Sequence, residues 1–82
     1  MQDERFVMLG EMSPGDEGKI VEVRGSRDVR KKLADMGLVK GARVRVVRYS
    51  PLGDPIEVRV RNYNLTLRKD EAKFVLVEVV GK

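Results

Sequence analysis

The sequence lacks several residue types on which most enzymes depend. Its 82 residues include no cysteine, no histidine and no tryptophan. Without cysteine there is no thiolate nucleophile, and without histidine the commonest general base and metal ligand is missing. The serines at positions 13, 26 and 50 stand where turns and a helix start are expected, which are structural settings for a hydroxyl. We therefore predict that the protein is not an enzyme.

Long apolar runs are also missing. No stretch approaches the roughly 20 apolar residues that span a bilayer, and the opening Met1-Gln-Asp-Glu-Arg lacks the apolar segment of a signal peptide. Together with the absence of disulfides, these features favour a cytoplasmic location. The length predicts one domain over residues 1–82, with a core from about residue 7 to residue 80.

Charge is abundant but mixed in sign. Seventeen lysines and arginines face thirteen acidic residues, a formal net charge of +4 and a pI near 9.7. This excess permits attraction to an acidic partner or to nucleic acid. Because acidic residues are interspersed along almost the whole chain, a solvated surface of mixed charge is the favoured interpretation of the composition.

One stretch, residues 26–38, has helical spacing. Val29, Leu33 and Met36 form an apolar stripe at i, i+4 and i+7. Ser26 is suited to the N-cap, where its hydroxyl can accept a hydrogen bond from a first-turn N–H. Gly37 can take the left-handed conformation that ends many helices, and Leu38 can then fold back onto Leu33. We predict one helix with these two ends.

The rest of the chain reads as short strands and turns. Strands are predicted over residues 18–25, 43–49, 56–61, 65–67 and 74–80. The first has an ambiguous phase that indicates a bulge, and the last is apolar enough to be central. A turn is expected at Asn62–Asn64 and a helical turn at residues 68–73. The pattern favours a mostly β protein, a small SH3-like antiparallel barrel of about five strands with one α-helix after the first long strand. An OB-fold, whose helix follows the third strand, is the alternative.

The loop at residues 50–55 carries the clearest functional signal. Its Pro51-Leu-Gly-Asp-Pro55 sequence places an apolar side chain, Leu52, at a tip stiffened by two prolines. A preorganised anchor of this kind favours recognition of a partner. The alternative is that Leu52 folds back and covers the open end of the barrel.

Two rival functions can be assessed from side chains. An arginine-rich strand face could contact the phosphates of RNA, but sheet-based RNA binders also need exposed aromatic side chains, and only four aromatics are present. Carboxylates could bind a hard divalent cation, as they would in a metal-responsive regulatory domain, but they show no recognisable ligand spacing, so no cofactor is predicted. The arginines are Arg43, Arg45, Arg48, Arg59, Arg61 and Arg68; the carboxylates are Asp16, Asp54, Glu57, Asp70 and Glu71.

Several of these segments together resemble one known family. Arg30–Leu38, Gly41–Val44, Ser50–Ile56, and Leu67-Arg68 with Glu71-Ala72 are similar to the FeoA family, over about Leu9 to Val79. The resemblance implies an SH3-like barrel without enzymatic activity, a cytoplasmic accessory protein of ferrous-iron transport. Such proteins are thought to assist the membrane transporter FeoB, which carries a cytoplasmic GTP-binding domain. Membrane contact would then be indirect, through FeoB, and self-association stays open.

The resemblance also suggests a docking surface. Carried over by position, it lies where Met36-Gly-Leu38 meets the loop at residues 51–55, with Arg68 nearby. We expect apolar anchors to make the main contacts. Asp54 and Arg68 would orient the loop or the partner, and Arg59 or Arg61 would steer association. The predicted partner-binding residues are Met36, Leu38, Pro51, Leu52, Asp54, Arg59 and Arg68.

Overall fold

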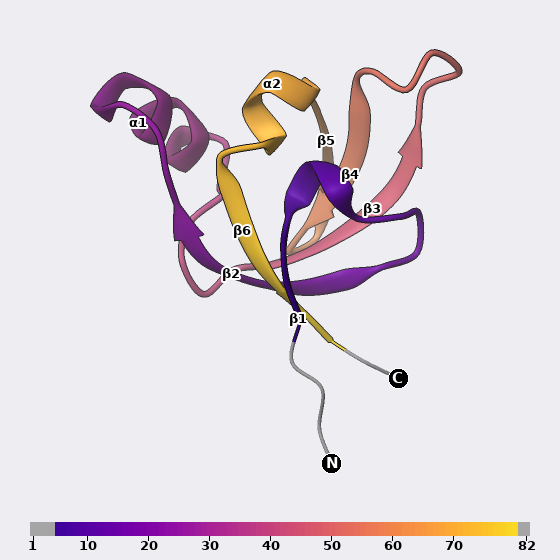
Figure 1. The fold of residues 1–82 in the computed structure, drawn as a ribbon, viewed down its shortest axis with the longest axis horizontal. Helices are drawn as coiled ribbons and strands as arrows, with labels where there is room; N and C mark the ends of the chain where they lie inside the picture. The colour runs from indigo at the N-terminus through magenta and orange to yellow at the C-terminus, as the bar shows by residue number, and fades with distance from the viewer. Residues whose placement is uncertain (1–4, 81–82) are drawn as a thin grey trace.

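A computed structural model describes residues 5–80 and shows a strongly curled antiparallel sheet with helices at one end (Figure 1). The strands are β1 (Arg5–Met8), β2 (Glu17–Val23), β3 (Arg43–Tyr49), β4 (Ile56–Val60), β5 (Tyr63–Leu67) and β6 (Val75–Val79). The helices are a 3₁₀ turn η1 (Leu9–Glu11), α1 (Arg27–Asp35) and a single turn α2 (Lys69–Ala72). Apart from Arg5, the N-terminal stretch used in the signal-peptide argument lies outside the described residues.

The sheet has six strands in the order β1-β6-β2-β3-β4-β5. The additional strand is β1, whose four residues pair antiparallel with β6. Such a short segment carries little local signal, and its strand conformation depends on a partner strand about 70 residues away in the sequence. The final strand was predicted to be central, and β6 does lie between β1 and β2.

The predicted bulge in β2 is present. The pairing of β2 with β6 changes register between Ile20 and Glu22, which explains why the apolar residues of this strand fit no single face. Gly18 lies on the same strand, where a Cβ atom would stand 2.4 Å from the Glu78 carbonyl oxygen. Glycine is therefore required for the close approach of β2 to β6.

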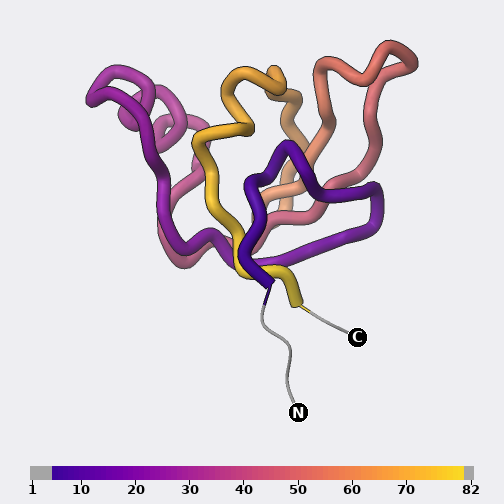
Figure 2. Tube along the Cα trace, viewed as in Figure 1, coloured from indigo at the N-terminus to yellow at the C-terminus, as the bar shows by residue number. Residues whose placement is uncertain are grey.

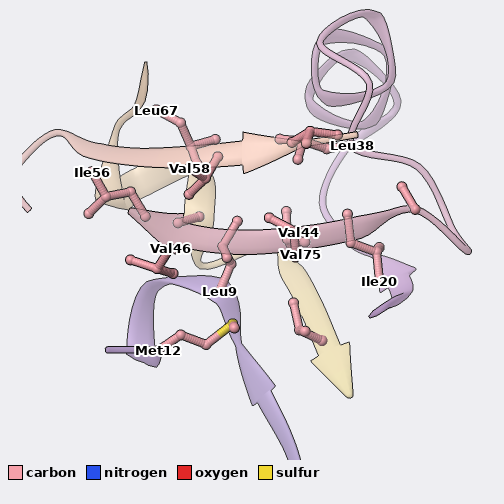
Figure 3. Close-up of a cluster of buried hydrophobic side chains, with 14 of the residues drawn as sticks. Leu9, Met12, Ile20, Leu38, Val44, Val46, Ile56, Val58, Leu67 and Val75 are labelled. Atoms are coloured by element: carbon pink, nitrogen blue, oxygen red, sulfur yellow. The ribbon is translucent and has the colours of Figure 1, made fainter. Parts of the chain in front are cut away.

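The core fills the inside of the curled sheet (Figure 3). Strand residues point inward at alternate positions, as the alternation in β3 and β4 predicts. Met12 is buried beneath the turn that follows η1, and Leu33 and Leu38 bring α1 into the same cluster. The buried residues are Leu9, Met12, Ile20, Leu33, Leu38, Ala42, Val44, Val46, Ile56, Val58, Val60, Leu67, Ala72, Val75 and Val77.

Both predicted ends of α1 are confirmed. The Ser26 hydroxyl accepts a hydrogen bond from the Val29 N–H at 3.2 Å. At the other end Gly37 has φ +93°, and the Leu38 N–H donates to the Leu33 carbonyl oxygen at 3.0 Å. This is the Schellman arrangement, in which the left-handed glycine lets the chain return to satisfy helix carbonyls. It turns the chain from α1 toward β3 and directs Leu38 inward.

The turn between β4 and β5 differs from the prediction. Strand β5 already begins at Tyr63, and the positive φ of +57° belongs to Arg61 rather than to an asparagine. Tyr63, Leu65 and Leu67 alternate along this strand, a pattern that could have indicated its full length. Pairing of Tyr63 with Val60 extends the ladder and leaves only two residues for the turn.

Candidate partner-binding surface

Three segments lie along the same edge of the molecule: α2 in the middle, the C-terminus of α1 on one side of it and the loop at residues 50–55 on the other (Figures 1 and 2). The start of β1 and the end of β6 lie at the opposite end of the same view. The strands thus position, on one side, the segments from which the docking surface was predicted.

The β3–β4 loop is closed at its base and open at its tip. The Ser50 N–H donates to the Pro55 carbonyl oxygen at 3.1 Å, and the Gly53 N–H donates to the Ser50 carbonyl oxygen at 2.7 Å. Leu52 projects from this frame with 95% of its surface exposed. The alternative in which Leu52 folds back over the barrel is therefore wrong for this structure. A leucine this exposed contributes almost nothing to the core.

Asp54 joins the loop to α2. Its Oδ1 accepts a hydrogen bond from the Lys69 N–H at 3.0 Å, so its carboxylate satisfies an unpaired donor in the first turn of α2. The contact spans fifteen residues of sequence, and no local pattern could have indicated it. It orients the loop relative to α2.

A groove of about 500 Å³ runs between these segments. It brings together Met36, Asp54 and Arg68, three residues predicted for the docking surface. Met36 supplies an apolar, half-buried side chain, whereas Arg68 is exposed beside it. The complete lining is Lys32, Met36, Asp54, Pro55, Thr66, Leu67, Arg68 and Glu71. The groove is thus an apolar floor with a charged rim.

An ion pair crosses the rim of this groove. The Lys32 ammonium lies 2.6 Å from Glu71 Oε2, and the other Glu71 oxygen accepts the Arg68 N–H at 3.0 Å. The hydrogen bond from Lys32, followed by that from the Arg68 backbone, lowers the pKa of the Glu71 carboxyl below its usual value. Glu71 is therefore ionised at neutral pH and holds α1 against α2.

Two predicted residues lie elsewhere. Leu38 has no exposed surface, so it cannot contact a partner in this conformation, because the helix-ending turn drives it into the core. Arg59 is exposed but lines a different hollow, which shares no residue with the groove. Pro51 stands beside Leu52 on the exposed loop. The predicted docking surface thus included one core residue, Leu38, and one arginine, Arg59, that lines another hollow.

Tyr63 belongs near this surface and was missed. Its hydroxyl donates to the Met36 carbonyl oxygen at 2.8 Å, and the hydroxyl end of the side chain lies beside Gly37. Tyr63 has 41% of its surface exposed. Because Tyr63 was predicted to lie in a turn, it was not included among the partner-binding residues. It links β5 to the end of α1.

Metal ligands do not cluster within the described residues. Across positions 5–80, no group of three acidic side chains is arranged so that it could hold a metal ion. Asp16 accepts the Ser13 N–H, and Glu57 accepts hydrogen bonds from Arg48 and Asn64. In the same part of the chain, no helix combines the length and apolar content needed to cross a membrane.

Comparisons with known proteins give consistent results. The family model described as the FeoA domain matches residues 7–79. The solution structure of a FeoA-like protein from Clostridium acetobutylicum is 38% identical, with a TM-score of 0.88, covering 100% of this chain and 93% of that one. The crystal structure of Stenotrophomonas maltophilia FeoA, complexed with zinc and described as an SH3 domain protein, is 32% identical. Its TM-score is 0.75, covering 87% of this chain and 88% of that one. This likeness confirms the SH3-like fold.

A longer relative combines two functions in one chain. The fusion protein of Fe(2+) transport protein A and the Fe(2+) transporter FeoB from Porphyromonas gingivalis is 39% identical over 73 residues. The match covers 89% of this chain but only 9% of that protein.

Proposed function

This chain belongs to the FeoA family of ferrous-iron transport accessory proteins, and we propose that it acts by docking on the cytoplasmic domain of the transporter FeoB. Docking would modulate iron uptake or the GTPase cycle of that domain. The fusion of an equivalent domain to FeoB in Porphyromonas gingivalis supports the association, since two proteins joined in one chain act in proximity.

The observation that carries the proposal is Leu52. This side chain is almost fully exposed at the tip of a loop whose base is closed by two backbone hydrogen bonds. Holding the loop in one shape before binding lowers the entropy cost of association. Full burial of a leucine against a partner contributes about 1.5–3 kcal/mol. Leu52 is therefore the proposed anchor of the interface.

The neighbouring groove supplies the rest of the proposed surface. Pro51 extends the apolar tip, and Met36 offers a half-buried apolar contact beside it. Arg68 gives a charge at the rim that can orient the partner, while Asp54 supports the loop from behind through Lys69. An apolar centre with a polar rim is the usual composition of a non-obligate interface.

We further propose that the protein acts without catalysis, as a single cytoplasmic module that reaches the membrane only through FeoB. The residue content supports this, because a chain without histidine or cysteine has few groups suited to acid–base or nucleophilic work. FeoA is not a known enzyme family.

Calorimetric titration with the cytoplasmic domain of FeoB from the same organism tests the proposal. Leu52→Asp should weaken binding by about 10- to 150-fold, the equivalent of losing a buried leucine contact. Phe6→Asp is the matched control, because Phe6 is also an exposed apolar residue, at 52%, but lies on β1 away from the loop. The control should bind within about twofold of the unmodified protein.

Both variants must first be shown to fold, by circular dichroism and thermal melting. If Leu52→Asp remains folded and binds FeoB as tightly as the unmodified protein, Leu52 is not in the interface. If no binding is detected for the unmodified protein at high concentration, the docking proposal itself fails.

A further inference from the structure

We propose that a second site, at the opposite end of β4 from the loop, binds a small polyphosphate anion through Arg43, Arg45, Arg59 and Arg61. The site is a hollow of about 550 Å³ on the outer face of the sheet, within the size range of small-ligand pockets. Its chemistry is that shared by inorganic tripolyphosphate and the phosphate tail of a nucleotide. The inference does not depend on the docking proposal.

Charge is unbalanced in this hollow. Four arginines line it against a single carboxylate, Glu17, which already pairs with Arg43 at 3.6 Å. For Arg45, Arg59 and Arg61, residues 5–80 provide no carboxylate within ion-pair distance. Four basic side chains outside the hollow form ion pairs: Arg24–Glu22, Lys31–Asp35, Lys32–Glu71 and Arg48–Glu57. Others, such as Arg27 and Arg30, form none with the described part of the chain, so what distinguishes the hollow is that its arginines lie together.

The strand register adds repulsion to this imbalance. Arg45 of β3 and Arg59 of β4 are direct partners across the ladder. Like charges at such positions destabilise a sheet. Glu17 of β2 is the ladder partner of Arg45 on its other side, but its carboxylate pairs with Arg43, so an anion between the guanidinium groups of Arg45 and Arg59 would relieve their repulsion. Arg61, which directly follows β4, adds a conformational cost of another kind. Its backbone has a φ of +57°, which is uncommon for a residue with a side chain.

Arg59 is oriented without losing its charge. Its Nη1 donates to Asn64 Oδ1 at 3.0 Å, and Asn64 donates in turn to Glu57 Oε2 at 2.9 Å. The partner of Arg59 is thus a neutral amide, while Glu57 is occupied by Arg48 and Asn64. A positioned guanidinium with free N–H groups is suited to a two-point contact with phosphate oxygens.

The lining favours a phosphate chain over a nucleic acid strand. It contains no aromatic residue, and binding of single-stranded nucleic acid relies on stacking of bases against aromatic rings. Tyr49 is engaged with the Gly10 and Met12 carbonyl oxygens, and Tyr63 reaches toward Met36. Guanidinium groups without a stacking platform recognise the phosphates alone.

Position separates this site from the tip of the docking loop. The β3–β4 loop precedes Ile56 at one end of β4, whereas Arg61 follows Val60 at the other. Five residues of strand span roughly 17 Å. A partner bound at Leu52 would therefore leave the arginine hollow accessible.

The test is an amide NMR titration of the isotope-labelled full chain with tripolyphosphate, ATP, adenosine and a single-stranded RNA oligonucleotide at constant ionic strength. Tripolyphosphate and ATP should shift residues 43–45 and 59–61, and adenosine should not. Equal affinity for tripolyphosphate and ATP would identify the phosphate chain as the ligand. Tighter binding of ATP would identify a nucleotide as the ligand.

Two double variants distinguish binding at this site from general attraction of anions to a positively charged protein. Arg45→Gln with Arg59→Gln should weaken tripolyphosphate binding at least tenfold, because charge-assisted contacts are lost. Arg27→Gln with Arg30→Gln removes the same charge from the exposed face of α1 and should change the affinity less than about twofold. Circular dichroism and thermal melting should show that both variants remain folded, because all four arginines are exposed.

Other results would overturn the proposal. Shifts as large on α1 as in the hollow, or equal weakening by both double variants, would show only unspecific attraction between charges. RNA binding tighter than tripolyphosphate at equal phosphate concentration, with shifts at Phe6 or Tyr63, would point to a nucleic-acid surface instead. Absence of any shift with millimolar tripolyphosphate would exclude the site.

Discussion

Replacing Gly37 with alanine tests the contact between α1 and β5. Gly37 has φ +93°, and a Cβ atom there would lie 2.0 Å from the Tyr63 hydroxyl oxygen. The substitution therefore has two costs: a left-handed conformation for a residue with a side chain, and displacement of Tyr63 from the Met36 carbonyl oxygen.

The magnitude of each cost can be estimated separately. The left-handed conformation costs about 1–2 kcal/mol, and losing the hydrogen bond from Tyr63 to Met36 costs about 1 kcal/mol. Gly37→Ala should thus lower the free energy of unfolding by about 2–3 kcal/mol. In a domain of this size that corresponds to a fall in Tm of roughly 8–24 °C.

Gly41→Ala is the matched control. Gly41 has nearly the same φ, +91°, but nothing lies within 4 Å of the Cβ atom that the substitution would add. It should cost only the conformational part, about 1–2 kcal/mol. Any effect of alanine on the unfolded chain is common to both variants and cancels in the comparison.

The assay is urea unfolding of both variants, repeated with Gly37→Ala in a Tyr63→Phe background. Without the hydroxyl, the nearest atom to the new Cβ is the ring carbon Cζ at 3.4 Å, an ordinary contact. Alanine should therefore cost about 1 kcal/mol less in that background than in the unmodified protein. Equal costs in both backgrounds, together with equal effects at positions 37 and 41, would refute the proposed contact.

Three further predictions concern stability. Asp54→Ala should cost about 0.5–2 kcal/mol and speed amide exchange at Lys69, whereas Asp54→Asn, which keeps an acceptor, should cost less. The pKa of Glu71 is lowered by folding, so its contribution is present above its unfolded pKa and lost as pH falls through the folded value. The stability difference between the unmodified protein and Glu71→Gln should therefore be larger at about pH 7 than at about pH 3 in urea unfolding; a constant difference would contradict the assignment. Gly18→Ala should cost about 2–3 kcal/mol, because the Cβ would meet the Glu78 carbonyl oxygen, and Gly10→Ala, with no contact under 3.4 Å, should cost far less in the same assay.

Local sequence patterns were sufficient for most of the fold. The ends of α1 follow from Ser26 and Gly37, whose side-chain hydroxyl and lack of Cβ act within a few residues. The bulge in β2 was visible as a conflict between two alternating patterns. The resemblance to FeoA then extended these local predictions to the arrangement of the whole chain.

Two features that the sequence did not predict, strand β1 and the contact of Asp54, depend on segments that are distant in the sequence. Strand β1 exists because β6 offers it a partner, and the position of Asp54 is determined by Lys69 of α2. The error at Leu38 is of another kind: it was assigned to the docking surface together with its neighbour Met36, although the predicted return of the chain onto Leu33 already implied that Leu38 is buried. Adjacency in sequence does not tell which side of the chain a residue occupies after a turn.

The central claim, docking of this FeoA-family chain on FeoB, is tested most directly by amide NMR of the labelled chain titrated with the cytoplasmic domain of FeoB. We expect shifts concentrated at Met36, at Pro51–Asp54 and at Arg68, where the groove and the exposed loop meet. Shifts confined to the opposite end of β4, at Arg43–Arg45 and Arg59–Arg61, or no shifts at all, would contradict it.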